Sequence, residues 1–236
     1  MSDEARKLDA ESIRAALHRA ADLAADYLTG GVERSSVRPR IEPGEIGSRL
    51  PDAPPASGEP LDRILDDYVE LIEPHVTHWN HPGFLAYFAI TGSAPGVVAE
   101  TLSAALNVNA MLWRTSPAAT ELEERACDWL RQMVDLPDGF RGHINDTASI
   151  STLLALAAAR EAADLDVRQR GLAGRPDLPG LRVYASDQAH SSVDKAAMTL
   201  GLGLDGVRRL PHDEDYRLDP EALREAIDRD LSDGLR

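Results

Sequence analysis

The sequence predicts an α/β fold in which a helical N-terminal arm precedes the first part of a parallel sheet wound with helices. Three observations predict it. Apolar residues recur at three- and four-residue spacing in two stretches before Pro74, which is typical of amphipathic helices. After Gly142, short strand-like segments alternate with helical ones, and this alternation indicates a parallel sheet. Only three strands are recognisable and Arg236 lies just past a helix, so we expect the sheet to be incomplete in this chain.

Residues 1–92 are expected to form the arm. Helices are predicted from Glu11 to Leu28 and from Leu61 to Ile72, and the proline-rich stretch between them shows no periodicity. Two helices joined in this way bury little apolar surface by themselves. Their apolar stripes are therefore expected to need another surface.

Residues 93–236 are expected to form the first half of a larger domain, opening with helices over Gly96–Leu106 and Pro117–Val134. The second of these helices has an apolar stripe that we expect to face inward, made of Leu122, Ala126, Trp129, Leu130 and Met133. Three strand and helix pairs follow, with strands at His143–Ile144, Arg182–Ala185 and Gly206–Leu210 and helices at Ser149–Ala163, Ser192–Leu200 and Pro220–Leu231.

Composition and charge exclude several classes of partner. A net charge of −15 argues against nucleic acid and anionic membrane surfaces, because both attract basic patches. No stretch approaches the roughly 18 continuous apolar residues of a transmembrane helix. The one cysteine, Cys127, is expected to be buried, and it cannot form a disulfide within the chain, which fits a reducing compartment. We therefore expect a cytoplasmic protein with no nucleic-acid and no membrane partner.

Three histidines at three-residue intervals, His75, His78 and His81, invite interpretation as a metal site. We reject it, because Pro74 and Pro82 bracket the run and break any helix that would align the imidazoles. Neither a cysteine nor a cluster of carboxylates nearby completes a coordination sphere. No metal site is predicted.

A polar turn before an alanine- and leucine-rich helix, GHINDTASISTLLALAAAR from Gly142 to Arg160, has the composition of a phosphate site. The first N–H groups of a helix have no intrahelical acceptor, and the helix dipole adds roughly half a positive charge there. Thr147 and Ser149 add hydroxyls, and the small Ala148 lets a ligand approach the backbone. Asp146 is a candidate N-cap. On these residues alone, an ordinary capped helix is the simpler alternative, and both interpretations stay open.

The run YASDQAHSSVDK at Tyr184–Lys195 is more specific. Together with HPGFLAYF near Pro82, SPAATELE near Pro117 and the DTAS turn, it resembles the aromatic-L-amino-acid decarboxylase family, the group II pyridoxal-phosphate-dependent decarboxylases. The resemblance extends in unbroken order from about Ile13 to Arg236. It implies the aspartate aminotransferase-like fold (fold type I), pyridoxal 5'-phosphate as cofactor, and packing of the N-terminal arm on a second copy of the assembly.

The resemblance also implies roles in cofactor binding. Thr147, Ala148 and Ser149 match the family's phosphate turn, and His190 matches the imidazole that stacks on the cofactor ring. Stacking fixes which substrate bond stands perpendicular to the ring. The same histidine is expected to relay the proton that replaces the carboxylate, so His190 is the predicted catalytic residue.

The aromatic residues of HWNHPGFLAYFAI match the wall of the family's substrate pocket, and their flat faces suit an aromatic side chain better than glutamate. Where many animal members read Pro-Thr, this chain has Ala89-Ile90, which weakens the inference of a catechol substrate. Phenylalanine, tyrosine, tryptophan and DOPA stay undistinguished. The residues implied to bind the substrate are Trp79, Tyr87, Phe88, Ile90 and, across the dimer interface, Met111.

Two parts of the family's machinery do not occur in this sequence. Lys195 stands five residues after His190, about 140° further around a helix. The family's lysine lies instead in an Asn-Pro-His-Lys run, and its aspartate for the pyridine nitrogen lies in a His-Val-Asp-Ala-Ala motif. We therefore expect the Schiff-base lysine to come from a C-terminal fragment or companion chain, as in a nicked or split enzyme.

Three interpretations of function stay open. The preferred one is a pyridoxal-phosphate-dependent carboxy-lyase that acts on a small-molecule substrate, an aromatic L-amino acid, once this chain combines with the lysine-bearing part and dimerises. The second is a non-catalytic assembly module or an inactive truncated fragment. The third keeps the cofactor but carries out oxidative deamination, and the sequence does not contain the residue that decides it.

Overall fold

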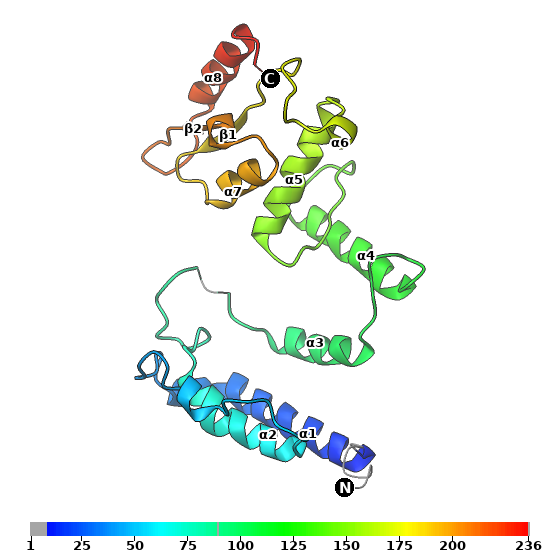
Figure 1. Cartoon of the computed structure of the whole chain (residues 1–236), viewed down its shortest axis with the longest axis vertical. Helices are drawn as coiled ribbons and strands as arrows, with labels where there is room; N and C mark the ends of the chain where they lie inside the picture. The colour runs from blue at the N-terminus through cyan, green and yellow to red at the C-terminus, as the bar shows by residue number, and fades with distance from the viewer. Residues whose placement is uncertain (1–8, 89, 236) are drawn as a thin grey trace. The chain divides into compact units, whose positions relative to one another are not determined.

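The computed structural model describes residues 9–88 and 90–235 (Figure 1). The contacts divide the chain into two compact units, Met1–Asn109 and Ala110–Arg236. The regular elements described in the first unit are all helical, whereas the second unit combines helices with a parallel sheet. Within the two described ranges, no helix has both the length and the apolar character needed to cross a membrane.

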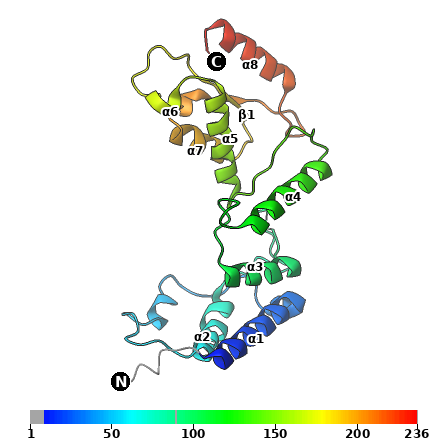
Figure 2. The same ribbon diagram turned by 90° about the vertical axis from the view of Figure 1, so that its right-hand side faces the viewer.

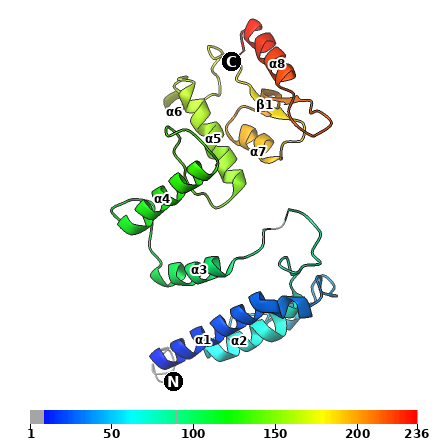
Figure 3. The ribbon, with the colours of Figure 1, turned by 180° about the vertical axis from the view of Figure 1, so that it is seen from behind.

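The first unit is built around α1 (Ala10–Asp26) and α2 (Leu61–Asp67), which lie side by side (Figures 1 and 3). The Asp9 carboxylate caps α1 by accepting a hydrogen bond from a backbone N–H of the first turn, at 2.7 Å. Both helices continue into wider π-helical turns, at Tyr27–Gly31 and Tyr68–Ile72. The two predicted helices are therefore confirmed, although each ends irregularly.

A third helix in this unit, α3 (Ala94–Leu106), begins two residues before its predicted start. The Ser93 hydroxyl accepts a hydrogen bond from the Gly96 N–H at 3.2 Å, and Asn107 ends the helix in the left-handed conformation. Single turns of 3-10 helix lie at Val32–Arg34, Gly47–Arg49 and Glu73–His75.

The α1–α2 pair leaves its own apolar stripe uncovered, as predicted. Ile13 is 40% exposed and Leu17 is 57% exposed. Polar contacts join the two helices, because Arg19 donates to the Asp66 carboxylate at 2.6 Å and to the Asp62 carbonyl at 3.0 Å. The stripe is thus available to another surface.

Five α-helices and two strands are described in the second unit. They follow the predicted order, and one of the five helices is short and was not predicted. The elements of this unit are α4 (Pro117–Met133), α5 (Ala148–Ala162), α6 (Val167–Arg170), β1 (Val183–Ser186), α7 (Ser192–Thr199), β2 (Val207–Leu210) and α8 (Pro220–Ser232). The helix α6 was not predicted, and the other boundaries lie within two residues of the predicted ones.

The two strands pair in parallel, with Val183 opposite Val207 and Ser186 opposite Leu210. The α/β class and the incomplete wound sheet are therefore confirmed. The predicted strand at His143–Ile144 is wrong, because the structure places no strand beside it to complete a ladder within the described residues. Its backbone is held by a side chain instead, since the Ile144 N–H donates to Glu123 of α4 at 2.9 Å.

Two adjacent arginines of β2 point to opposite faces of the sheet, as alternate residues of a strand must. Arg208 reaches α8, where Asp230 also accepts a hydrogen bond from Tyr184 of β1 at 2.7 Å. Arg209 reaches the other face, where it donates to Asp194 of α7 at 2.8 Å. One arginine therefore anchors α8 and the other anchors α7.

The predicted inward stripe of α4 is wrong for this chain. Trp129 and Leu130 are 52% and 54% exposed, and the other large members of the stripe, Leu122 and Met133, are more exposed still. Only the small Cys127 is buried as predicted, because Gly142 packs against it so closely that an added Cβ would lie 2.8 Å from the Cys127 Cβ.

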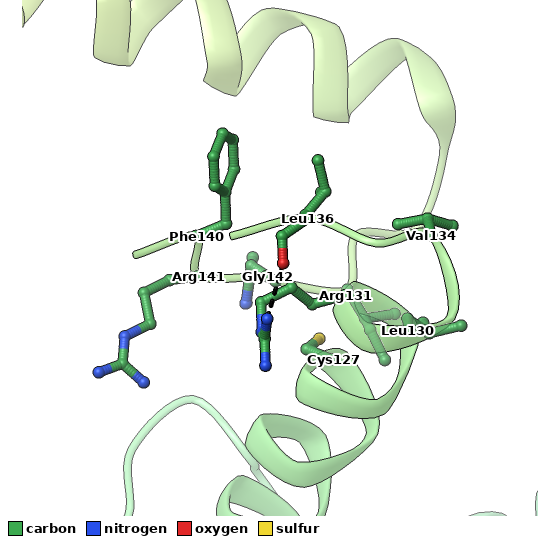
Figure 4. Close-up of a pocket in the computed structure, with 10 residues that line it drawn as sticks. Cys127, Leu130, Arg131, Val134, Leu136, Phe140, Arg141 and Gly142 are labelled. Atoms are coloured by element: carbon green, nitrogen blue, oxygen red, sulfur yellow. Dashed lines mark hydrogen bonds between the residues drawn. The ribbon is translucent and has the colours of Figure 1, made fainter. Parts of the chain in front are cut away.

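An apolar pocket of about 260 Å³ opens between the C-terminal half of α4 and the segment after it (Figure 4). Leu130, Val134, Leu136 and Phe140 line it, and Arg131 closes one side by donating to the Leu136 carbonyl at 2.7 Å. None of the predicted site residues lines this pocket.

Candidate functional site

The predicted phosphate turn forms the N-terminus of α5. Thr147 is the N-cap, and its hydroxyl accepts a hydrogen bond from the Ile150 N–H at 3.2 Å. The predicted cap, Asp146, is wrong by one residue, because the helix begins at Ala148 and Thr147 therefore occupies the capping position. The N–H groups of Ala148 and Ser149 make no hydrogen bond among the described residues, so they are available to an anion.

The side chains around this turn hold its shape and leave one hydroxyl unused. Asn145 donates to the Ser151 hydroxyl at 3.0 Å, and that hydroxyl lies 3.3 Å from the Thr147 carbonyl oxygen, to which it donates. Thr147, Ala148 and Ser149 are all exposed, and within the described ranges the Ser149 hydroxyl has no hydrogen-bond partner. The turn is therefore preorganised, and it presents two N–H groups and one hydroxyl to solvent.

His190 lies in the loop that leaves the carboxyl end of β1 and enters α7. Its Nδ1 accepts a hydrogen bond from the Ser192 N–H at 3.1 Å, so the neutral imidazole carries its proton on Nε2. The side chain is exposed, which leaves the Nε2–H and the ring faces accessible. The local sequence thus fixes both the tautomer and the direction of the ring.

The fold brings the phosphate turn and His190 to the same end of two neighbouring helices. The Thr152 hydroxyl in the first turns of α5 lies 3.4 Å from the Ser192 hydroxyl at the start of α7. At the other end, Arg160 of α5 donates to the Leu200 carbonyl that follows α7, at 3.1 Å. The two helices therefore run in the same direction (Figures 1 and 2), and both of their N-termini lie at the carboxyl edge of the sheet.

Sequence reasoning missed two side chains that fix the loop carrying His190. Arg209 donates to the Ser186 carbonyl at 2.8 Å and to the Ala189 carbonyl at 3.2 Å, in addition to its ion pair with α7. His212 contacts the Asp187 carboxylate at 2.6 Å, and this hydrogen bond lowers the pKa of Asp187. Two consecutive arginines in a strand were the available signal, because one of them had to point toward the α7 face.

The predicted substrate aromatics lie in the first unit, and two of them, Trp79 and Tyr87, stack on each other. The Trp79 ring lies 5.5 Å from the Tyr87 ring at an interplanar angle of 1°, and 4.9 Å from the Phe84 ring at 27°. Tyr87 is in the left-handed conformation with φ 59°. Phe88 and Ile90 are exposed, while Ala89 between them lies outside the described residues. Met111 of the second unit is 75% exposed.

The three histidines considered for a metal each have a separate partner on Nδ1. His75 contacts the Leu71 carbonyl at 2.8 Å, and His81 accepts from the Gly83 N–H at 2.8 Å. His78, which is 1% exposed, pairs with the Tyr27 hydroxyl at 2.9 Å. The described residues contain no group of three His, Cys, Asp or Glu side chains arranged to hold a metal ion.

Comparison with known proteins places this site in a family. The family model described as the pyridoxal-dependent decarboxylase conserved domain matches residues 43–236. Tryptophan decarboxylase 2 of Oryza sativa subsp. japonica is 40% identical, over 98% of this chain and 46% of its own length. Phenylacetaldehyde synthase of Arabidopsis thaliana is 39% identical, over 98% of this chain and 47% of its own. The crystal structure of Oryza sativa TDC with PLP and tryptamine matches with a TM-score of 0.85 at 37% identity, covering 98% of this chain and 50% of that one.

The parallel sheet with its helices and the likeness to a solved structure with PLP define a cofactor-binding α/β protein of fold type I. The chain belongs to the pyridoxal-dependent decarboxylase family. The predicted family is thereby confirmed, and with it the class of cofactor, because dependence on pyridoxal defines the family. The chain spans about half the length of the curated relatives it matches.

Proposed function

We propose that this chain supplies one part of a pyridoxal-phosphate-dependent decarboxylase that acts on an aromatic L-amino acid. The observation that carries the proposal is the placement of the Thr147–Ser149 turn and His190 at neighbouring helix N-termini. The lysine that binds the cofactor's aldehyde would come from a C-terminal segment or a companion chain, since the relatives are about twice as long as this chain. A second copy of the assembly would cover the apolar stripe of α1 and α2.

The residues of the turn fit the phosphate group. The N–H groups of Ala148 and Ser149 point away from α5 without an intramolecular acceptor, and the helix dipole favours an anion there. The Ser149 hydroxyl adds a donor that no other described residue uses. When bound, pyridoxal phosphate supplies an electron sink that lets the amino acid lose carbon dioxide. The turn's task is to hold that group in one orientation.

His190 is proposed to orient the ring and to hold a proton. A neutral imidazole can lie flat against an aromatic ring, and its Nδ1 is already engaged by the Ser192 N–H. The accessible Nε2–H is then the donor that remains for the reaction, which replaces a carboxylate by a proton. We therefore assign both tasks, orienting the ring and holding the proton, to His190. The hydrogen bond from the Ser192 N–H sets both the direction of the imidazole and its tautomer.

Trp79, Tyr87, Phe88, Ile90 and Met111 are proposed to bind the substrate side chain. The parallel stack of Trp79 and Tyr87 supports an aromatic substrate, because it offers flat faces to an aromatic side chain. The apolar Ile90 supports a substrate without a catechol hydroxyl at that point. Relatives named for tryptophan and for tyrosine support the same substrate class.

A second candidate keeps the same site but yields an aldehyde. Phenylacetaldehyde synthase is 39% identical to this chain, and its name states an aldehyde product. In that case decarboxylation would be coupled to oxidative deamination, with dioxygen as oxidant. The identity of the product, amine or aldehyde, separates the two candidates.

The test combines the purified chain with the lysine-bearing segment and records the absorbance of bound cofactor. Carbon dioxide release is then measured with phenylalanine, tyrosine, tryptophan, DOPA and glutamate, and the products are identified. We expect cofactor absorbance and release from an aromatic substrate only. Cofactor binding without any release supports an inactive fragment, and the lack of both supports a non-catalytic assembly module.

Replacing Ser149 by alanine is expected to weaken cofactor retention about tenfold or more, because a hydrogen bond to a charged group contributes about 1.5–3 kcal/mol. Cofactor retained after dialysis measures the effect. The matched control is Ser232→Ala, whose hydroxyl donates to the Arg229 carbonyl of α8 at 2.7 Å, remote from the turn in sequence. Equal retention by the two variants would refute the phosphate assignment.

The remaining features are proposed on the same basis. We assign residues 1–92 to a dimerisation arm and residues 93–236 to the first half of the cofactor-binding domain. The predicted cytoplasmic location stays a prediction. Light scattering tests the proposed dimer. It measures whether the molar mass doubles when this chain is mixed with the lysine-bearing part.

A further inference from the structure

Arg209 holds the segment that carries His190 at three points. One Nη atom donates to the Ser186 carbonyl at 2.8 Å and the Ala189 carbonyl at 3.2 Å. The other Nη donates to the Asp194 carboxylate at 2.8 Å. These acceptors lie at the end of β1, directly before His190, and in the first turn of α7.

The contacts of Arg209 span both ends of the segment that sets the imidazole. Ala189 precedes His190, and the peptide plane between them contains the carbonyl that Arg209 holds. Ser192, whose N–H donates to the His190 Nδ1 at 3.1 Å, belongs to the same first turn as Asp194. A shift of either end would move the ring or its hydrogen-bond donor.

The contacts need the geometry of a guanidinium. Its planar fork presents several donors in fixed directions, so one side chain can reach two carbonyls and a carboxylate at once. Arg209 and Asp194 are both largely covered, with side chains 29% and 32% exposed. The neighbouring Arg208 points to the opposite face of the sheet, toward α8, and does not touch this segment.

We infer that Arg209 is a positioning residue that acts through His190 in the decarboxylation reaction. This inference rests on the proposed function, because it assigns a role within the same site. His212 makes the other contacts on the loop, with Asp187 at 2.6 Å and with Gln188 at 3.5 Å, and they are separate from the three contacts of Arg209. Arg209 therefore affects the reaction indirectly, by fixing the direction of the His190 ring.

The kinetic test uses the assembled holoenzyme and four variants. Arg209→Met is expected to lower kcat by about 10- to 100-fold, because small displacements of a reacting group cost that much, with KM changed less than about twofold. Arg209→Lys should recover part of the loss, since lysine reaches one acceptor but lacks the fork. Asp194→Asn should give a smaller loss in the same direction. Arg229→Met, the same change at an exposed position of α8, should leave kcat unchanged.

A double-mutant cycle separates positioning from a general loss of structure. If Arg209 acts through His190, Arg209→Met in a His190→Ala background should lower kcat by less than about twofold further. Multiplicative losses would overturn the inference, and so would an unchanged kcat in Arg209→Met. If Arg209→Met does not fold, Asp194→Asn is carried through the same cycle and judged in the same way.

The second readout does not depend on activity. Nitrogen-15 spectra of the histidines in the full chain, with His190 assigned by its loss in His190→Ala, report which ring nitrogen is protonated. We expect protonated Nε2 and unprotonated Nδ1 in the wild type and in Arg229→Met, and averaged signals in Arg209→Met. Identical spectra in all three would overturn the inference. If the wild type binds no cofactor and has no activity, the proposed function is wrong. The spectra would still show whether Arg209 positions the His190 ring.

Discussion

Replacing His190 by alanine is expected to lower turnover of the assembled enzyme by about 10²- to 10⁴-fold, the range that general acid catalysis contributes. The variant loses the ring that we propose to lie against the cofactor, together with its accessible Nε2–H. Cofactor content should change far less, because the phosphate turn belongs to α5 and its cap does not involve His190. Turnover and bound cofactor are measured on the same preparation.

The matched control for this change is His143→Ala. His143 is another exposed histidine of the second unit, 68% exposed, and it pairs with Glu123 at 2.8 Å instead of with α7. Its replacement should leave turnover unchanged. If His190→Ala retains the wild-type rate, or loses the cofactor in proportion to the rate, the role assigned to His190 is wrong.

Periodicity located the long helices because their signal is local. The spacing of apolar residues and the capping residues of α1, α5 and α8 are contained within each segment, so tertiary structure was not needed to find them. The same argument explains the small error at the phosphate turn. Asp146 and Thr147 are both good capping residues, and only the path of the backbone decides between them.

The failures concern features that depend on distant partners. A strand at His143–Ile144 would need a neighbouring strand, and the structure holds that segment by the Glu123 side chain instead. The stripe of α4 shows which face is apolar but not what covers it. Arg209 was overlooked because two of its three acceptors are backbone carbonyls, which carry no sequence signal.

The buried carboxylate of Asp230 carries the second large effect that we expect. Asp230 is 1% exposed and accepts hydrogen bonds from Tyr184, at 2.7 Å, and from Arg208. Burial opposes its ionisation, but the hydrogen bonds of Tyr184 and Arg208 outweigh burial and hold the pKa of Asp230 below its ordinary value. Burial, together with the hydrogen bond to Asp230, raises the pKa of Tyr184 to about 12.

These two pKa shifts define the pH range in which the network stabilises the fold. The pKa of Asp230 is lowered in the folded chain, so its contribution is present above roughly pH 4 and is lost as the pH falls through the lowered value. The pKa of Tyr184 is raised, so its contribution is present below roughly pH 10 and is lost as the pH rises toward 12. Thermal stability should therefore fall at both ends of this range.

Asp230→Ala is expected to lower the melting temperature at neutral pH more than twice as much as Tyr184→Phe lowers it. Tyr184→Phe removes one hydrogen bond, about 1 kcal/mol or roughly 2–4 °C. Asp230→Ala leaves both the Tyr184 hydroxyl and Arg208 without their acceptor, and a buried donor left unpaired costs more than the bond itself gains. Calorimetry on the assembly, with the exposed Asp228→Ala of the same helix as control, measures the difference. The role of Asp230 would be refuted by two results together. These are equal melting temperatures for Asp230→Ala and Asp228→Ala, and the same fall in melting temperature at acid pH in Asp230→Ala as in the wild type.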